Sequence, residues 1–100
     1  MRRFKARRDP CEAPIVEALR KVGASVAFLD GKGLPDLLVG FRGELYLLEC
    51  KQPLGVKGGK SKDGQHLTPD QEAWHAQWKG RPPAIVRTVE EALRAIGAVP

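Results

Sequence analysis

Residues 36–51 read Asp36-Leu-Leu-Val-Gly-Phe-Arg-Gly-Glu-Leu-Tyr-Leu-Leu-Glu-Cys-Lys51, which is two short apolar runs separated only by Arg42-Gly43. Apolar runs joined by two residues that include glycine are typical of a β-hairpin. Counting outwards along the two strands from this loop, Asp36 pairs with Glu49. The sequence therefore predicts that two carboxylates face each other across the hairpin.

Opposed carboxylates need a physical reason. Directly opposed side chains have Cβ atoms about 5 Å apart, and like charges at this separation are destabilising. The usual compensation is a hard divalent cation, which takes oxygen ligands from one or two carboxylates and from substrate phosphates. Lys51 lies on the same face, two residues beyond Glu49. One edge of the hairpin thus presents Asp36, Glu49 and Lys51, either as a site or as solvated charges at strand ends.

This grouping tolerates an error in the predicted loop. A type I turn with Gly43 in a bulge would shift the pairing by one residue. Diagonal neighbours would still lie within about 8 Å of each other.

The overall composition is that of one globular domain, and its positive net charge favours a polyanionic partner. The chain has 100 residues, 42% hydrophobic and 29% charged, which suits a single core. A net charge of +5 favours nucleic acid. We predict a domain over residues 9–100 and a basic arm over residues 1–8, which binds DNA or merely solubilises the chain. The arm carries Arg2, Arg3, Lys5, Arg7 and Arg8.

No part of the sequence indicates a membrane or an oxidising compartment. No run approaches the roughly 18 apolar residues of a membrane span, and the start lacks the apolar core of a signal peptide. Cys11 and Cys50 are too few for a disulfide framework and are most simply reduced thiols. We expect a cytoplasmic protein, in a bacterium or a phage-infected host.

A first helix is predicted over Pro10–Val22, with Asp9 as N-cap and Gly23 just past the end. Its apolar stripe is Ile15, Val16, Leu19 and Val22. Glu12 occupies the same stripe one turn earlier. This inward acid either joins a site or complements the positive helix N-terminus.

The segments on either side of the hairpin contain turns and a long loop. A strand over Ala24–Leu29 precedes a turn in which Gly31 and Gly33 either admit a ligand near Asp36 or simply allow the chain to turn. Gln52–Leu67 is a long polar loop, which would cover a bound phosphodiester as a mobile basic flap. Its lysines are Lys57, Lys60 and Lys62.

The last third of the chain predicts a helix, a strand and a helix. Thr68, Pro69 and Gln71 form a capping box that opens a helix with Gln71, Trp74, His75 and Trp78 on one face. The two tryptophans indicate core packing, with base stacking as the alternative, and His75 alone does not make a metal site. A strand over Ala84–Arg87 and a second capping box at Thr88-x-x-Glu91 follow, and the closing helix ends at Gly97.

A right-handed crossover through the second helix would make the third and fourth strands parallel. The predicted architecture is α-β-β-β-α-β-α, an α/β fold whose central mixed sheet is flanked by helices.

The motifs Gly33-Leu-Pro-Asp36, Glu49-Cys-Lys51 and Thr68-x-x-Gln71, preceded by helical Glu12, resemble those of the virus-type replication-repair nuclease (VRR-NUC) family of PD-(D/E)XK nucleases. The resemblance spans about residues 9–90. It implies a restriction-endonuclease-like core and a phosphodiesterase active site.

The resemblance implies that Asp36 and Glu49 bind one or two Mg²⁺ or Mn²⁺ ions. The backbone carbonyl of Cys50 would be a further ligand, with the Cys50 side chain pointing away. Lys51 orients the attacking water and stabilises the charge on the scissile phosphate. Glu12 supports the metal directly or through its water, and Gln71 orients groups around the site. No small-molecule cofactor is expected. The expected DNA contacts are Arg2, Arg3, Lys5, Arg7, Arg8, Lys32, Lys57, Lys60 and Lys62.

The resemblance further implies a homodimer that cuts branched DNA, as Holliday-junction resolvases do, in replication, recombination or repair. One alternative is a non-catalytic nucleic-acid-binding module, for which opposed carboxylates would be a disadvantage because they repel phosphate. Another is a nicking or restriction-like nuclease that acts on ordinary duplex DNA.

Overall fold

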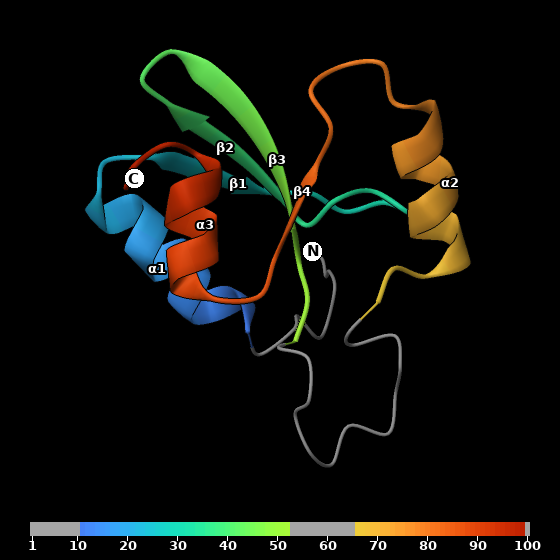
Figure 1. Cartoon of the computed structure of the whole chain (residues 1–100), viewed down its shortest axis with the longest axis horizontal. Helices are drawn as coiled ribbons and strands as arrows, with labels where there is room; N and C mark the ends of the chain where they lie inside the picture. The colour runs from blue at the N-terminus through green and yellow to red at the C-terminus, as the bar shows by residue number, and fades with distance from the viewer. Residues whose placement is uncertain (1–10, 53–65, 100) are drawn as a thin grey trace, which may run out of the picture.

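The computed structural model describes residues 11–52 and 66–99, in which three helices and four strands follow the predicted order (Figure 1). The elements are α1 (Glu12–Lys21), β1 (Ser25–Phe28), β2 (Leu37–Phe41), β3 (Glu44–Cys50), α2 (Pro69–Gln77), β4 (Ala84–Val86) and α3 (Val89–Ala95). The α/β class and the mixed sheet are confirmed.

The sheet has the strand order β1-β2-β3-β4. The first two pairings are antiparallel, and β3 pairs with β4 in parallel, as the crossover predicts. Leu38 lies opposite Leu47, which is the register predicted from a two-residue loop. Arg42 and Gly43 have φ angles of 51° and 81°, the left-handed pair that a type I′ turn requires.

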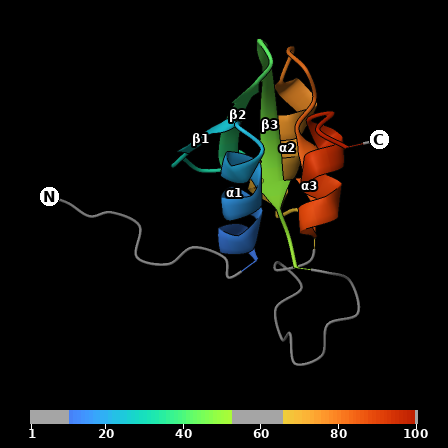
Figure 2. The same ribbon diagram turned by 90° about the vertical axis from the view of Figure 1, so that its left-hand side faces the viewer.

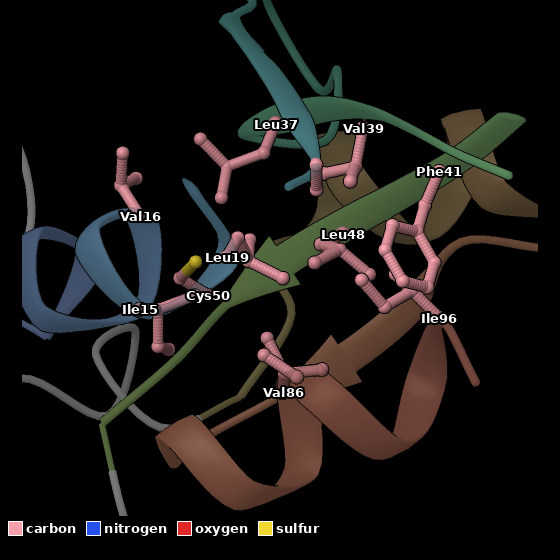
Figure 3. Close-up of a cluster of buried hydrophobic side chains, with 12 residues drawn as sticks. Ile15, Val16, Leu19, Leu37, Val39, Phe41, Leu48, Cys50, Val86 and Ile96 are labelled. Atoms are coloured by element: carbon pink, nitrogen blue, oxygen red, sulfur yellow. The ribbon is translucent and has the colours of Figure 1, made fainter. Parts of the chain in front are cut away.

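Helices cover the two faces of the sheet unequally. In Figures 1 and 2, α1 and α3 lie side by side on one face and α2 lies on the other. Alternate residues of β2 point into the layer beneath α1 and α3, and they form the core drawn in Figure 3. Its buried members are Ile15, Val16, Leu19, Ala24, Leu37, Val39, Phe41, Leu48, Cys50, Val86, Ala92 and Ile96.

The second helix contributes no buried residue, so the predicted core role of its tryptophans is wrong. Trp78 is 41% exposed. It stacks on Trp74 with ring centroids 4.7 Å apart, and its indole N–H donates to the carbonyl of Arg81. The reason is that the hydrophobic core lies on the opposite face of the sheet, so the helical spacing of the two rings brings them against each other.

The first helix begins later than predicted. Its N-cap is Cys11, which makes no side-chain capping bond, whereas Asp9 and Pro10 lie outside the described residues. Pro14 explains the difference, because proline has no N–H and is tolerated only in the first turn of a helix. When the helix starts at Glu12, Pro14 is its third residue, and the N–H at that position makes no intrahelical hydrogen bond in any case.

The other two helix starts are those predicted, with one difference in bonding. Thr68 and Gln71 form the full capping box, with bonds of 3.2 and 2.9 Å. Thr88 Oγ1 accepts from the Glu91 N–H, but Glu91 Oε1 accepts from the Arg87 N–H. The second box is therefore incomplete. Among the described residues, no helix has the length and apolar character needed to cross a membrane.

Candidate active site

The hairpin brings together the three residues that its register predicts. Asp36 immediately precedes β2, Glu49 lies near the end of β3, and Lys51 follows that strand. Leu37 pairs with Leu48, so the next pair outwards is Asp36 and Glu49. Asp36 Oδ2 accepts the backbone N–H of Cys50 at 2.8 Å, which fixes the carboxylate against the end of β3.

Glu49 and Lys51 are buried on the α2 side of the sheet. Glu49 is 1% exposed and Lys51 is 5% exposed, although charged side chains are seldom buried unless paired. Lys51 Nζ lies 3.6 Å from Glu49 Oε2, and Gln71 Nε2 donates to the same oxygen at 2.9 Å. One oxygen of Glu49 thus has two partners.

The other oxygen of Glu49 has none. Glu49 Oε1 is buried without a hydrogen-bond partner. Burial raises the pKa of Glu49 to about 8; the negative charge of Asp36 adds to this shift and the positive charge of Lys51 opposes it. A carboxylate with a free buried oxygen and an adjacent acid is suited to a cation, which would satisfy the oxygen and remove the repulsion.

The first helix adds a third acid to this place. Glu12 is 3% exposed, and its carboxylate, the carboxylate of Asp36 and the Cys50 Sγ each have an atom within 4.8 Å of the others. The inward-facing acid at the start of α1 therefore lies near Asp36, where it also stands in the first turn of the helix, so both roles predicted for it remain open. Glu12 and Asp36 thus bring two carboxylates close together, and carboxylate oxygens are the ligands that Mg²⁺ and Mn²⁺ prefer.

Cys50 is close to these acids, yet its side chain belongs to the core. Figure 3 shows its sulfur among the buried apolar side chains beneath α1. Burial and the neighbouring carboxylates raise the pKa of the thiol, so it stays protonated and is a poor metal ligand. The Cys50 side chain thus points to the opposite face of the sheet from Glu49 and Lys51, as predicted. Its Sγ nevertheless lies within 4.8 Å of ligand atoms of Asp36 and Glu12.

Two residues of α2 face the site on successive turns. Gln71 joins the cap and the site, because its Oε1 accepts from Thr68 N–H while its Nε2 donates to Glu49. His75 lies one turn further, with Nε2 buried and without a hydrogen-bond partner. Burial and the charge of Lys51 lower its pKa. Sequence reasoning gave His75 no role, although its spacing from Gln71 placed it on the same face.

The predicted DNA contacts are only partly described. Lys32 is exposed in the loop before β2, and its Nζ lies 3.8 Å from Asp70 Oδ2. Residues 53–65 of the predicted flap lie outside the described residues, as do the residues of the basic arm. The predicted DNA contacts that lie outside the described residues are Arg2, Arg3, Lys5, Arg7, Arg8, Lys57, Lys60 and Lys62.

The loop that carries Asp36 packs tightly on α2 at Gly33. This glycine has φ +81°, and a Cβ added to it would lie 2.6 Å from the Asp70 carbonyl oxygen. The loop and the helix that bears Gln71 are thus held together by backbone contact. The positive φ of Gly33 fits the predicted role in a turn, its contact with α2 was not predicted, and the predicted approach of a ligand stays a prediction.

We expect Gly33→Ala to destabilise the protein and to reduce activity by separating Asp36 from Gln71. Gly43→Ala is the matched control, because Gly43 has the same φ of +81° with nothing within 4 Å of an added Cβ. Both variants place alanine at a positive φ that glycine adopts more easily. Only Gly33→Ala also adds overpacking, which typically costs about 1–3 kcal/mol. Urea denaturation of the two variants measures the difference, and equal losses of stability would refute the packing argument.

Comparisons with known proteins identify no relative of this chain. No protein-family model matches the chain, and neither the curated proteins nor the solved structures include a match. The case for a function therefore rests on the site, on the motifs in the sequence and on the charge of the chain.

Proposed function

We propose that the protein is a Mg²⁺- or Mn²⁺-dependent endonuclease of the PD-(D/E)XK type, which hydrolyses phosphodiester bonds in DNA. The observation that supports this most is the buried Glu49 carboxylate, which has one oxygen without a partner and lies beside Asp36 and Lys51. The family resemblance of the motifs around these residues points to the same chemistry.

The donor set determines which residues would hold the metal. Asp36 and Glu49 would supply carboxylate oxygens, the backbone carbonyl of Cys50 would be a further ligand, and Glu12 would contribute directly or through a bound water. When bound, the ion makes a water acidic enough to attack phosphorus near neutral pH and offsets charge on the phosphate.

The remaining groups position that reaction. The Lys51 ammonium, held 3.6 Å from Glu49 Oε2, would orient the attacking water and stabilise the negative charge that grows on the scissile phosphate. Gln71 holds Glu49 Oε2 through its amide, which leaves Oε1 for the metal. The capping box fixes the Gln71 rotamer, so the start of α2 and the geometry of the site are coupled.

For the substrate we propose branched DNA, cut by a homodimer in replication, recombination or repair in the cytoplasm. The resemblance to resolvase-like nucleases motivates this, and the net charge of +5 suits a DNA partner. Leu45 and Ile85, on the same side of the sheet as α2, are 57% and 41% exposed and offer apolar area for a second subunit. Light scattering at micromolar concentration tests the dimer, and a monomeric mass would contradict it.

Cleavage assays test the proposed activity. Labelled four-way junction, flap, nicked and linear duplex DNA would be incubated with Mg²⁺, Mn²⁺ or EDTA, with Lys51→Ala protein in parallel. Paired symmetric cuts in the junction that disappear with EDTA and with the substitution are the expected result. Equal cleavage of linear duplex would replace branch selectivity with a restriction-like activity. Binding without metal-dependent cleavage would favour the non-catalytic DNA-binding module.

A further inference from the structure

Two buried side-chain atoms among residues 11–52 and 66–99 have no hydrogen-bond partner, and both lie in the same region. They are Glu49 Oε1 and His75 Nε2. His75 follows Gln71 by one turn of α2, and Lys51 is close enough to influence the pKa of its ring. The metal proposed above accounts for the Glu49 oxygen, whereas nothing in that account uses His75.

Packing alone does not explain His75. The ring contacts Trp74 edge to face, with centroids 6.2 Å apart, on a helix that contributes no buried residue. A buried polar atom without a partner costs about 1–3 kcal/mol, which an apolar side chain of similar size would avoid. The unsatisfied nitrogen is therefore best explained by a hydrogen-bonding partner that comes from outside the described residues.

The surroundings select the chemistry of that partner. Burial and the Lys51 charge lower the pKa of His75, so the ring is neutral near pH 7 and has one N–H to donate. An N–H donor beside an ammonium group is complementary to an anion with several acceptor oxygens, such as a phosphodiester. Asp36 and Glu49 exclude most anions from this place unless a cation accompanies them.

We propose that His75 Nε2 donates a hydrogen bond to a non-bridging oxygen of a nucleic-acid phosphate bound beside the one that Lys51 contacts. This inference rests on the proposed nuclease function and adds a substrate contact to it. His75 would bind the DNA backbone and fix its position relative to the metal site. It would take no part in the transfer of protons to or from the reacting atoms.

Kinetics of His75 variants test this role. His75→Leu removes the donor at similar volume, and His75→Gln places an amide N–H near the position of Nε2. We expect His75→Leu to raise KM about tenfold, the loss typical of one hydrogen bond to a charged group, with kcat changed less than threefold. His75→Gln should recover most of the loss. Gln77→Leu, an exposed polar position on the same helix, is the matched control and should leave KM unchanged.

A modified substrate identifies the phosphate. Neutral methylphosphonates would be placed one at a time at the positions flanking the cleaved bond. At one position we expect the wild type to lose about tenfold in KM while His75→Leu loses nothing further, since both changes remove the same contact. An unchanged KM in His75→Leu, or effects that simply add at every position, would overturn the His75 assignment. If the wild type neither binds nor cleaves any nucleic acid, the proposed function itself fails.

Discussion

Replacing Lys51 with methionine is expected to slow metal-dependent DNA cleavage by about 10²–10³-fold, the usual cost of losing one group that stabilises transition-state charge. Methionine keeps most of the length of the side chain and removes the ammonium. The Lys51 Nζ lies 3.6 Å from Glu49 Oε2, and the residue is almost fully buried. The loss should appear in kcat, because the charge is needed most in the transition state.

The assay conditions must separate this effect from metal binding. Lys51 also lowers the pKa of Glu49, so its removal makes that carboxyl harder to ionise and weakens metal binding near neutral pH. Single-turnover rates should therefore be measured at pH 8 with saturating Mn²⁺. Lys21→Met, at an exposed position in the last turn of α1, is the control and should keep full activity. Lys51→Met protein that cleaves at the wild-type rate would remove Lys51 from the mechanism.

Glu49→Gln should have opposite effects on stability and on activity. In EDTA at pH 8 we expect the variant to be more stable than the wild type by about 1–3 kcal/mol, because it removes a buried charge that Asp36 repels. Cleavage should fall below detection, because a metal ligand is lost. Mn²⁺ should raise the melting temperature of the wild type and leave that of the variant unchanged.

The pH dependence of this difference has a definite sign. The folded pKa of Glu49 lies well above the unfolded value of 4.5. Between the two values the unfolded chain has lost a proton that the folded protein retains, so the Glu49 contribution to stability falls as pH rises, by up to about 1.4 kcal/mol per pH unit. In EDTA from pH 5 to 8, urea denaturation should show this fall in the wild type relative to Glu49→Gln. The same pH slope in both proteins would contradict the raised pKa of the buried Glu49 carboxyl.

Local chemistry explains which parts of the fold could be predicted. The register of the hairpin follows from Arg42-Gly43, since a two-residue loop with positive φ at both positions leaves one pairing. The start of α2 follows from Thr68 and Gln71 by the same kind of argument. The predicted start of α1 at Pro10 is wrong because it would place Pro14 beyond the first turn of the helix, where proline is not tolerated.

The parts that could not be predicted depend on contacts between distant segments. Helical spacing places Trp74 and Trp78 on one face of α2, but it does not say that the core lies across the sheet from that helix. The opposed Asp36 and Glu49 were predicted because they belong to one hairpin. The unsatisfied nitrogen of His75 could not be predicted, since it depends on how α2 packs beside Lys51.

The central claim is that the Asp36 and Glu49 carboxylates form a divalent metal site, and calorimetric titration with Mn²⁺ tests it most directly. Titrations at pH 7 in two buffers of different ionisation enthalpy would also count the protons released. We predict saturable binding to the wild type with release of close to one proton, because Glu49 must ionise to bind the ion. Glu49→Gln should show neither binding nor proton release. Equal binding by the two proteins, or no saturable binding by the wild type at millimolar Mn²⁺, would contradict the account.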